Sequence, residues 1–94
     1  MKHARSDYDR IQDPATLIPD DEPVFLIRGQ DKAGPCAVEA WALEAMSFGA
    51  SREIIEAARA QAERMRDWQR DHASKIPDMP PEVSSRNRKA RQKT

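Results

Sequence analysis

The apolar residues of this chain form one short β-type run and two stripes at helical spacing. The run, residues 24–28, reads Val-Phe-Leu-Ile-Arg and lies between Pro23 and Gly29, a pattern typical of a strand. A lone strand cannot satisfy its own backbone hydrogen bonds. Two pairings satisfy it: a hairpin with residues 16–18 across the Pro/Asp loop 19–23, or the same run of a second copy.

The two stripes predict two helices joined by a short turn. Pro35 suits the first turn of a helix, Gly49 suits its C-terminal cap, and Ser51 suits the N-cap of the next helix. The second helix is expected from about residue 52 to about residue 74. The first stripe consists of Val38, Trp41, Ala42, Ala45 and Phe48. The second consists of Ile54 or Ile55, Ala58, Ala62, Met65, Trp68 and His72.

This pattern predicts an α+β fold that is mostly α. One short strand or small hairpin precedes an αα-hairpin with a long second helix. We expect a polar N-terminal segment at residues 1–15 and a single small α+β domain at residues 16–80. Residues 81–94 are expected to be a disordered basic tail, because residues 84–94 have no apolar residue larger than alanine.

A chain of 94 residues with few large apolar side chains builds only a thin core. Cys36 is its one cysteine, so no internal disulfide stabilises it, and we expect it to be a small buried thiol. Self-association is therefore the expected way to bury more apolar area, and the chain is predicted to be a homo-oligomer. No secretory segment or membrane-spanning run is apparent, which predicts a cytoplasmic protein without membrane contact.

The overall charge of zero hides an asymmetry. Residues 1–85 hold 11 Lys and Arg against 16 Asp and Glu, a net charge of −5, whereas residues 86–94 carry +5. A basic tail attracts phosphates, but it carries no aromatic residue on which bases could stack. It is either a solubilising tail or a nucleic-acid contact. The basic residues concerned are Arg86, Arg88, Lys89, Arg91 and Lys93.

The residues of the chain do not suggest an enzyme. No histidine is near Cys36 in sequence, so a nucleophile lacks a neighbouring base. There is no glycine-rich phosphate loop and no metal-ligand spacing, so we expect no cofactor and no metal. The consecutive acids Asp20, Asp21 and Glu22 lie on a proline-bounded loop and are read as a solvated turn.

The polar residues that follow the β-type run are the best candidate for a ligand site. Gly29 permits close approach of another backbone or a ligand. A guanidinium, an amide, a carboxylate and an ammonium stand there, and an aromatic ring folding back from the N-terminal segment would suit a nucleotide or another phosphate-bearing ligand. The alternative is that Arg28 and Asp31 form a cap and salt bridge at a helix start. The candidate residues are Tyr8, Arg10, Arg28, Gln30, Asp31 and Lys32.

The segments at residues 8–14 and 18–31 resemble a family of short proteins encoded by tailed bacteriophages and prophages. The resemblance continues in the pattern Pro35, Val38, Trp41-Ala42 and in Ala60-Gln61-Ala62, Met65, Trp68 and Ile76-Pro77-Asp78. It covers most of residues 8–80 and excludes the basic tail. It implies a phage accessory protein in a bacterial cytoplasm, and it implies no particular activity.

Taken together, the sequence predicts a non-enzymatic, homo-oligomeric binding module. By analogy with other small phage proteins, it is expected to interfere with a host system by sequestering a nucleotide-type ligand. Two alternatives stay open. One is a nucleic-acid-associated accessory protein that uses the basic tail, and the other is an interaction module that binds a host or phage protein.

Overall fold

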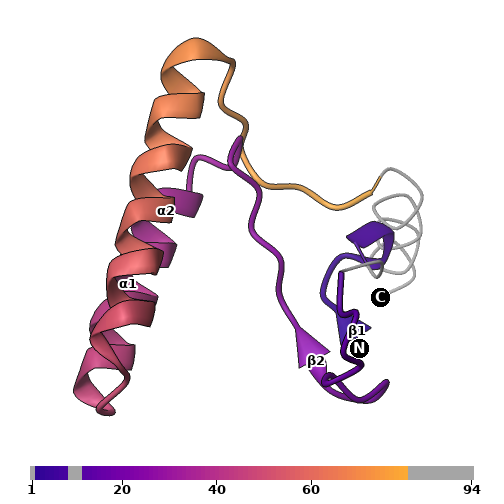
Figure 1. Cartoon of the computed structure of the whole chain (residues 1–94). Coiled ribbons are helices and arrows are strands. Elements are labelled where there is room, and N and C mark those ends of the chain that lie inside the picture. The colour runs from indigo at the N-terminus through magenta and orange to yellow at the C-terminus, as the bar shows by residue number, and fades with distance from the viewer. Residues whose placement is uncertain (1, 9–11, 81–94) are drawn as a thin grey trace, which may run out of the picture. The chain divides into compact units, whose positions relative to one another are not determined.

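A computed structural model describes residues 2–8 and 12–80 of the chain (Figure 1). The chain divides into two compact units. Unit 1 comprises Met1–Leu26 and Asp78–Thr94, and unit 2 comprises Ile27–Pro77. The predicted fold class is confirmed, since most of the regular structure is a helical hairpin and the strands are short. The domain boundaries expected from the sequence stay predictions.

Unit 2 is the helical hairpin, with α1 at Gly34–Ser47 and α2 at Arg52–Asp71 lying side by side (Figure 1). The predicted turn between them is confirmed. Gly49 adopts a φ of +84°, and the amides of Gly49 and Ala50 donate to the carbonyls of Met46 and Ala45. This pattern closes a helix through a left-handed residue, which glycine adopts without steric cost. Ser51 then caps α2, because its hydroxyl accepts a hydrogen bond from the amide of Ile54.

The second helix ends three residues earlier than expected. His72 leaves the helical conformation, and its imidazole stacks on the Trp68 indole with ring centroids 4.0 Å apart. The His72 Nδ1 atom also lies 2.9 Å from the carbonyl oxygen of Trp68. This local arrangement replaces the next helical turn, so α2 stops at Asp71.

Small side chains form the centre of the contact between the two helices. Ala42 of α1 and Ala62 of α2 are both 0% exposed, and Ile55 and Met65 of α2 are 6% exposed. Two facing alanines let the helix backbones approach closely, and Ile55 and Met65 supply most of the apolar volume. An ion pair between Glu39 and Arg66 joins the helices along one side of this core, and its hydrogen bond raises the pKa of Arg66.

Unit 1 contains the short parallel pair β1 (Lys2–His3) and β2 (Pro23–Val24), with His3 opposite Val24. In the structure β2 pairs with β1 of the same chain, so the first of the two expected pairings, the hairpin with residues 16–18, is wrong, whereas pairing with a second copy stays a prediction. The strand is also shorter than the predicted 24–28. Residues 16–18 instead follow a turn at residues 14–15, and the Asp13 carboxylate accepts hydrogen bonds from the amides of Leu17 and Ile18 at 3.1 and 3.0 Å.

Arg5 is the central side chain of unit 1. Its Nε donates to both oxygens of Asp7, and Nη1 donates to the carbonyl and the carboxylate of Asp78 at 3.1 and 2.9 Å. The guanidinium also lies over the Tyr8 ring, 4.7 Å from its centroid. Tyr8 belongs to the turn of 3-10 helix at Ser6–Tyr8, labelled η1 here. A single cation therefore joins residues near both ends of the described chain.

This cluster predicts acid sensitivity. The hydrogen bond from Arg5 holds the pKa of Asp7 below its ordinary value of 3.8. A carboxyl whose pKa is lower in the folded state stabilises that state above the unfolded pKa. We therefore expect the contribution of Asp7 to be present at neutral pH and to be lost as the pH falls below about 4 through the lowered pKa. Side-chain NMR titration of Asp7 measures the midpoint.

Arg5→Gln is the control for this titration, because it removes the positive charge and keeps a polar side chain. The Asp7 midpoint should then return toward its ordinary value. An unchanged midpoint in Arg5→Gln would show that Arg5 does not cause the shift.

Within residues 2–8 and 12–80, no helix has the length and apolar character needed to cross a bilayer.

Candidate functional site

Four of the six predicted ligand-site residues lie together in unit 2, directly before α1. Tyr8 lies in unit 1, and Arg10 lies outside the described residues. The alternative nucleic-acid site in the basic tail also lies outside the described residues. The four residues of unit 2 are Arg28, Gln30, Asp31 and Lys32.

The backbone of this segment is held from two sides. From α2, the Gln69 amide donates hydrogen bonds to the carbonyl oxygens of Gly29 and Asp31 at 2.9 and 2.8 Å. From the segment after α2, Lys75 forms a parallel bridge to Asp31. In that bridge the Lys75 amide donates to the Gln30 carbonyl at 2.7 Å, and the Lys32 amide donates to the Lys75 carbonyl at 2.9 Å. We call this set of six hydrogen-bonding residues the clasp: Gly29, Gln30, Asp31, Lys32, Gln69 and Lys75.

The Asp31 carboxylate organises the entry into α1. Its Oδ1 accepts a hydrogen bond from the Ala33 amide at 2.8 Å, while its carbonyl accepts one from the Gly34 amide at 2.9 Å. The N-cap of α1 is Ala33, and no side chain caps the helix, so the Asp31 carboxylate stabilises the turn before α1 rather than capping it. Gly34 is buried, and a Cβ at this position would lie only 3.2 Å from the Arg28 carbonyl oxygen. The close approach of these two segments therefore leaves little room for a side chain at position 34. A Cβ added to Gly29 would meet nothing within 4 Å, so Gly29 is not required for a close approach within unit 2.

Sequence reasoning missed Gln69 and Lys75. Gln69 follows Ala62 and Met65 at helical spacing, so its amide stands in the packed stripe of α2. A polar side chain at such a position needs a hydrogen-bond partner. The need of Gln69 for a hydrogen-bond partner is a signal that the sequence contains, but it does not identify which backbone groups are that partner.

The clasp predicts a specific effect of one isosteric substitution. Gln69→Glu replaces two N–H donors by a carboxylate that faces two carbonyl oxygens. We expect unit 2 to lose about 1–3 kcal/mol of stability at neutral pH, because both carbonyls lose their donor. Urea unfolding followed by circular dichroism measures the loss, and amide exchange at Lys32 and Lys75 should accelerate.

Gln12→Glu is the matched control, since Gln12 is exposed in unit 1. It should leave both the unfolding curve and the exchange rates of Lys32 and Lys75 unchanged. Slow exchange at these two amides in Gln69→Glu would mean that Gln69 does not hold the clasp.

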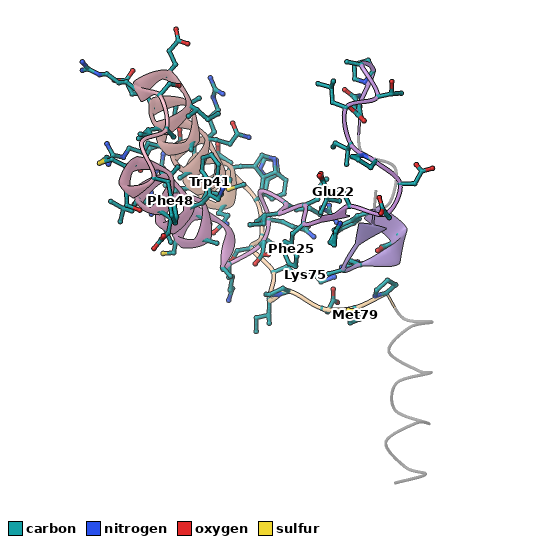
Figure 2. The ribbon with its side chains drawn as sticks, turned by 90° about the horizontal axis from the view of Figure 1, so that it is seen from below. Glu22, Phe25, Trp41, Phe48, Lys75 and Met79 are labelled. Carbon is teal, nitrogen blue, oxygen red and sulfur yellow. The ribbon has the colours of Figure 1, made fainter. Side chains whose placement is uncertain are left out.

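A second surface of unit 2 is more unusual than the clasp. Much of the predicted apolar stripe is not buried: Trp41 is 52% exposed, Phe48 86%, Ile54 45% and Trp68 41%. Trp41 and Phe48, which the sequence places on the apolar stripe of the first helix, therefore do not lie in the core. The apolar stripe of α1 is wider than the surface that α2 alone can cover. Ala42 is buried against α2, whereas Trp41 stays exposed at the edge of the stripe. Trp41 and Phe48 lie near one another on the hairpin in Figure 2.

These exposed side chains share one face of the hairpin. Taking Ala42 and Ala62 as the inward positions, helical spacing places Trp41 and Phe48 on one side of α1, and Glu39 on the other. On α2 the same spacing places Ile54 and Trp68 away from Arg66. The Glu39–Arg66 pair shows that these two sides of α1 and α2 lie on one face of the hairpin. The side of α1 with Trp41 and Phe48 and the side of α2 with Ile54 and Trp68 therefore lie together on the opposite face. We call it the hairpin face; its residues are Val38, Trp41, Ala45, Phe48, Ile54, Ala58, Gln61 and Trp68.

The hairpin face carries no charged residue, although a third of the chain is charged. Leu43 is also exposed, at 60%, but it lies on the side of α1 that carries Glu39. Contiguous exposed apolar side chains with a charged surrounding mark interaction surfaces. The hairpin face therefore has the chemistry of a protein-binding surface.

Two further features concern reactive groups. Cys36 is exposed at the start of α1, so the expectation of a buried thiol is wrong. Among the described residues, no group of three or more His, Cys, Asp or Glu side chains is placed to hold a metal ion.

Comparison with known proteins adds no relative: no protein-family model, curated protein or solved structure matches this chain.

Proposed function

We propose that this protein is a non-enzymatic binding module that acts through protein–protein contacts made by the hairpin face. One observation carries the proposal: two tryptophans, a phenylalanine and an isoleucine stay exposed on one uncharged face of a hairpin that buries only two large apolar side chains, Ile55 and Met65. Tryptophan and other aromatic side chains contribute much of the binding energy at protein interfaces. The resemblance of the sequence to short phage proteins supports a phage accessory protein in the bacterial cytoplasm.

Affinity capture with three baits tests this function. The baits are the full chain, Phe48→Glu on the hairpin face, and Leu43→Glu on the other side of α1. Each substitution places a carboxylate at an exposed apolar position, within α1 at Leu43 and at its C-cap at Phe48. We expect the unmodified chain and Leu43→Glu to retain the same polypeptides from phage-infected cells, and Phe48→Glu to lose them. Identical captures by all three baits would contradict a role of the hairpin face.

A second candidate function is capture of a phosphate-bearing small molecule, of the nucleotide type, beside the clasp. The observation that favours it is the rigid backbone of residues 28–32, from which the exposed side chains of Arg28 and Lys32 project. Both cations suit phosphate, and a fixed backbone lowers the entropy lost on binding. Against it, the Asp31 carboxylate already accepts a hydrogen bond from the Ala33 amide in the turn before α1.

Thermal-shift measurements with linear and cyclic nucleotides test the second candidate. A ligand at about 100 times its dissociation constant stabilises the folded state by roughly 2.7 kcal/mol. The shift should disappear in Lys32→Ala and persist in Lys2→Ala, which removes a lysine from unit 1. No shift with any nucleotide would leave the hairpin face as the functional surface.

A further inference from the structure

We infer that the hairpin face is covered by the hairpin face of a second copy of this chain, so that two hairpins form a four-helix bundle. This inference rests on the proposed function and names the partner of the same surface. It also changes which surface would form the homo-oligomer expected from the sequence. The β2 strand pairs within its own chain, so the contact between copies is assigned to the exposed hairpin face instead of the strand.

Charge favours a second copy as the occupant. None of the eight residues of the hairpin face is Asp, Glu, Lys or Arg. Two identical faces can therefore meet without burying like charges, which would be costly in a two-fold interface where each residue recurs on both sides. The charged pair Glu39–Arg66 lies on the opposite side of the hairpin and stays outside such an interface.

The available area also fits a dimer. Taking about 150–250 Å² for each aromatic side chain, the exposed parts of Trp41, Phe48, Ile54 and Trp68 amount to roughly 500 Å² per copy. Two copies then contribute roughly 1,000 Å² before the small residues between them are added, which approaches the roughly 1,200 Å² at the lower end of specific interfaces. Ala45 and Ala58 lie among the large side chains and offer space for those of the partner.

The hairpin face runs along the whole length of the helical hairpin. The chain enters and leaves unit 2 at the clasp, where Asp31 and Lys75 pair. Phe48 and Ile54 flank the turn at the other end of α1, whose 14 residues span about 20 Å. A second hairpin covers the whole length of the face, from Trp68 to Phe48.

Both tryptophans of the chain belong to the hairpin face, which supplies a direct readout. Light scattering of the full chain should give twice the 10.7 kDa chain mass, and tryptophan emission should shift to longer wavelength on dilution as the dimer dissociates. In Phe48→Glu the dimer should weaken by about 100-fold or more, because a carboxylate would be buried without a partner. Leu43→Glu should retain the dimer.

Three outcomes would overturn the inference: a full chain that is monomeric at all concentrations, a dimer that survives Phe48→Glu, or a dimer that Leu43→Glu disrupts equally. Circular dichroism of Phe48→Glu should show unchanged helix content, and Trp41→Ser serves as the second variant if that helix content falls. A monomeric chain that still captures another polypeptide through Phe48 would overturn the second copy as occupant and leave the proposed function intact.

Discussion

Ile55→Ala should lower the free energy of unfolding of unit 2 by about 2–5 kcal/mol, the usual range for removing a large aliphatic side chain from a core. Ile55 is 6% exposed and is one of the two large apolar side chains buried between the helices. Truncation to alanine leaves a cavity, and few neighbouring apolar side chains are available to move into it. Urea unfolding followed by circular dichroism, at a concentration where the protein is monomeric, measures the loss.

Ile54→Ala is the matched control, one position earlier on the same turn. Ile54 is 45% exposed, so its truncation should cost the monomer less than about 1 kcal/mol. Its effect should appear instead in the dissociation constant of the dimer. Equal losses of monomer stability in both variants would mean that α2 is rotated relative to the arrangement described.

Ala62→Leu should also destabilise the hairpin, by about 1–3 kcal/mol, for the opposite reason. Ala62 of α2 is 0% exposed, as is Ala42 of α1, so neither position has room for a larger side chain. A leucine there forces the helices apart or takes an unfavourable rotamer. The midpoint of thermal unfolding should fall, and the Glu39–Arg66 pair across the helices should weaken.

Ala60→Leu tests the same substitution at an exposed position of α2, two residues earlier. It should change stability by less than about 0.5 kcal/mol, because leucine and alanine are both good helix formers. If Ala62→Leu were as harmless as Ala60→Leu, the close approach of the two helices would be wrong.

The helical half of the fold was predictable because its signals are local. Pro35, Gly49 and Ser51 mark helix ends through their own backbone preferences, and each is found at the expected place. The end of α2 was less predictable, since it depends on the stacking of His72 on Trp68. The choice between Ile54 and Ile55 required knowledge of which way α2 turns toward α1.

The strand partner and the exposed aromatic residues could not be predicted from local signals. Lys2 and His3 pair with Pro23 and Val24 across 21 positions, and nothing in a polar N-terminal segment indicates such a pairing. The stripe through Trp41 and Phe48 is apolar whether it faces one helix or several. Periodicity indicates that a residue is on an apolar face, but it does not say how much of that face is covered.

The candidate site was predictable in part. Residues 28–32 do stand at the entry to α1, where the Asp31 carboxylate holds the turn before the helix but does not cap it. The contributions of Gln69 and Lys75 come from positions about 40 residues away, so they follow from the tertiary fold alone.

The long reach of the clasp also sets an order of events in folding. The contacts of the hairpin close a short turn at Gly49, whereas Gln69 must find Gly29 across 40 positions of chain. Closing a longer loop costs more chain entropy, and distant contacts form more slowly than local ones. The hairpin should therefore form first and the clasp last, so that the clasp is also the first part of unit 2 to open. In this protein the helices would then assemble on the time scale of a local structure, while the polar segment before α1 takes its final shape only after they are in place.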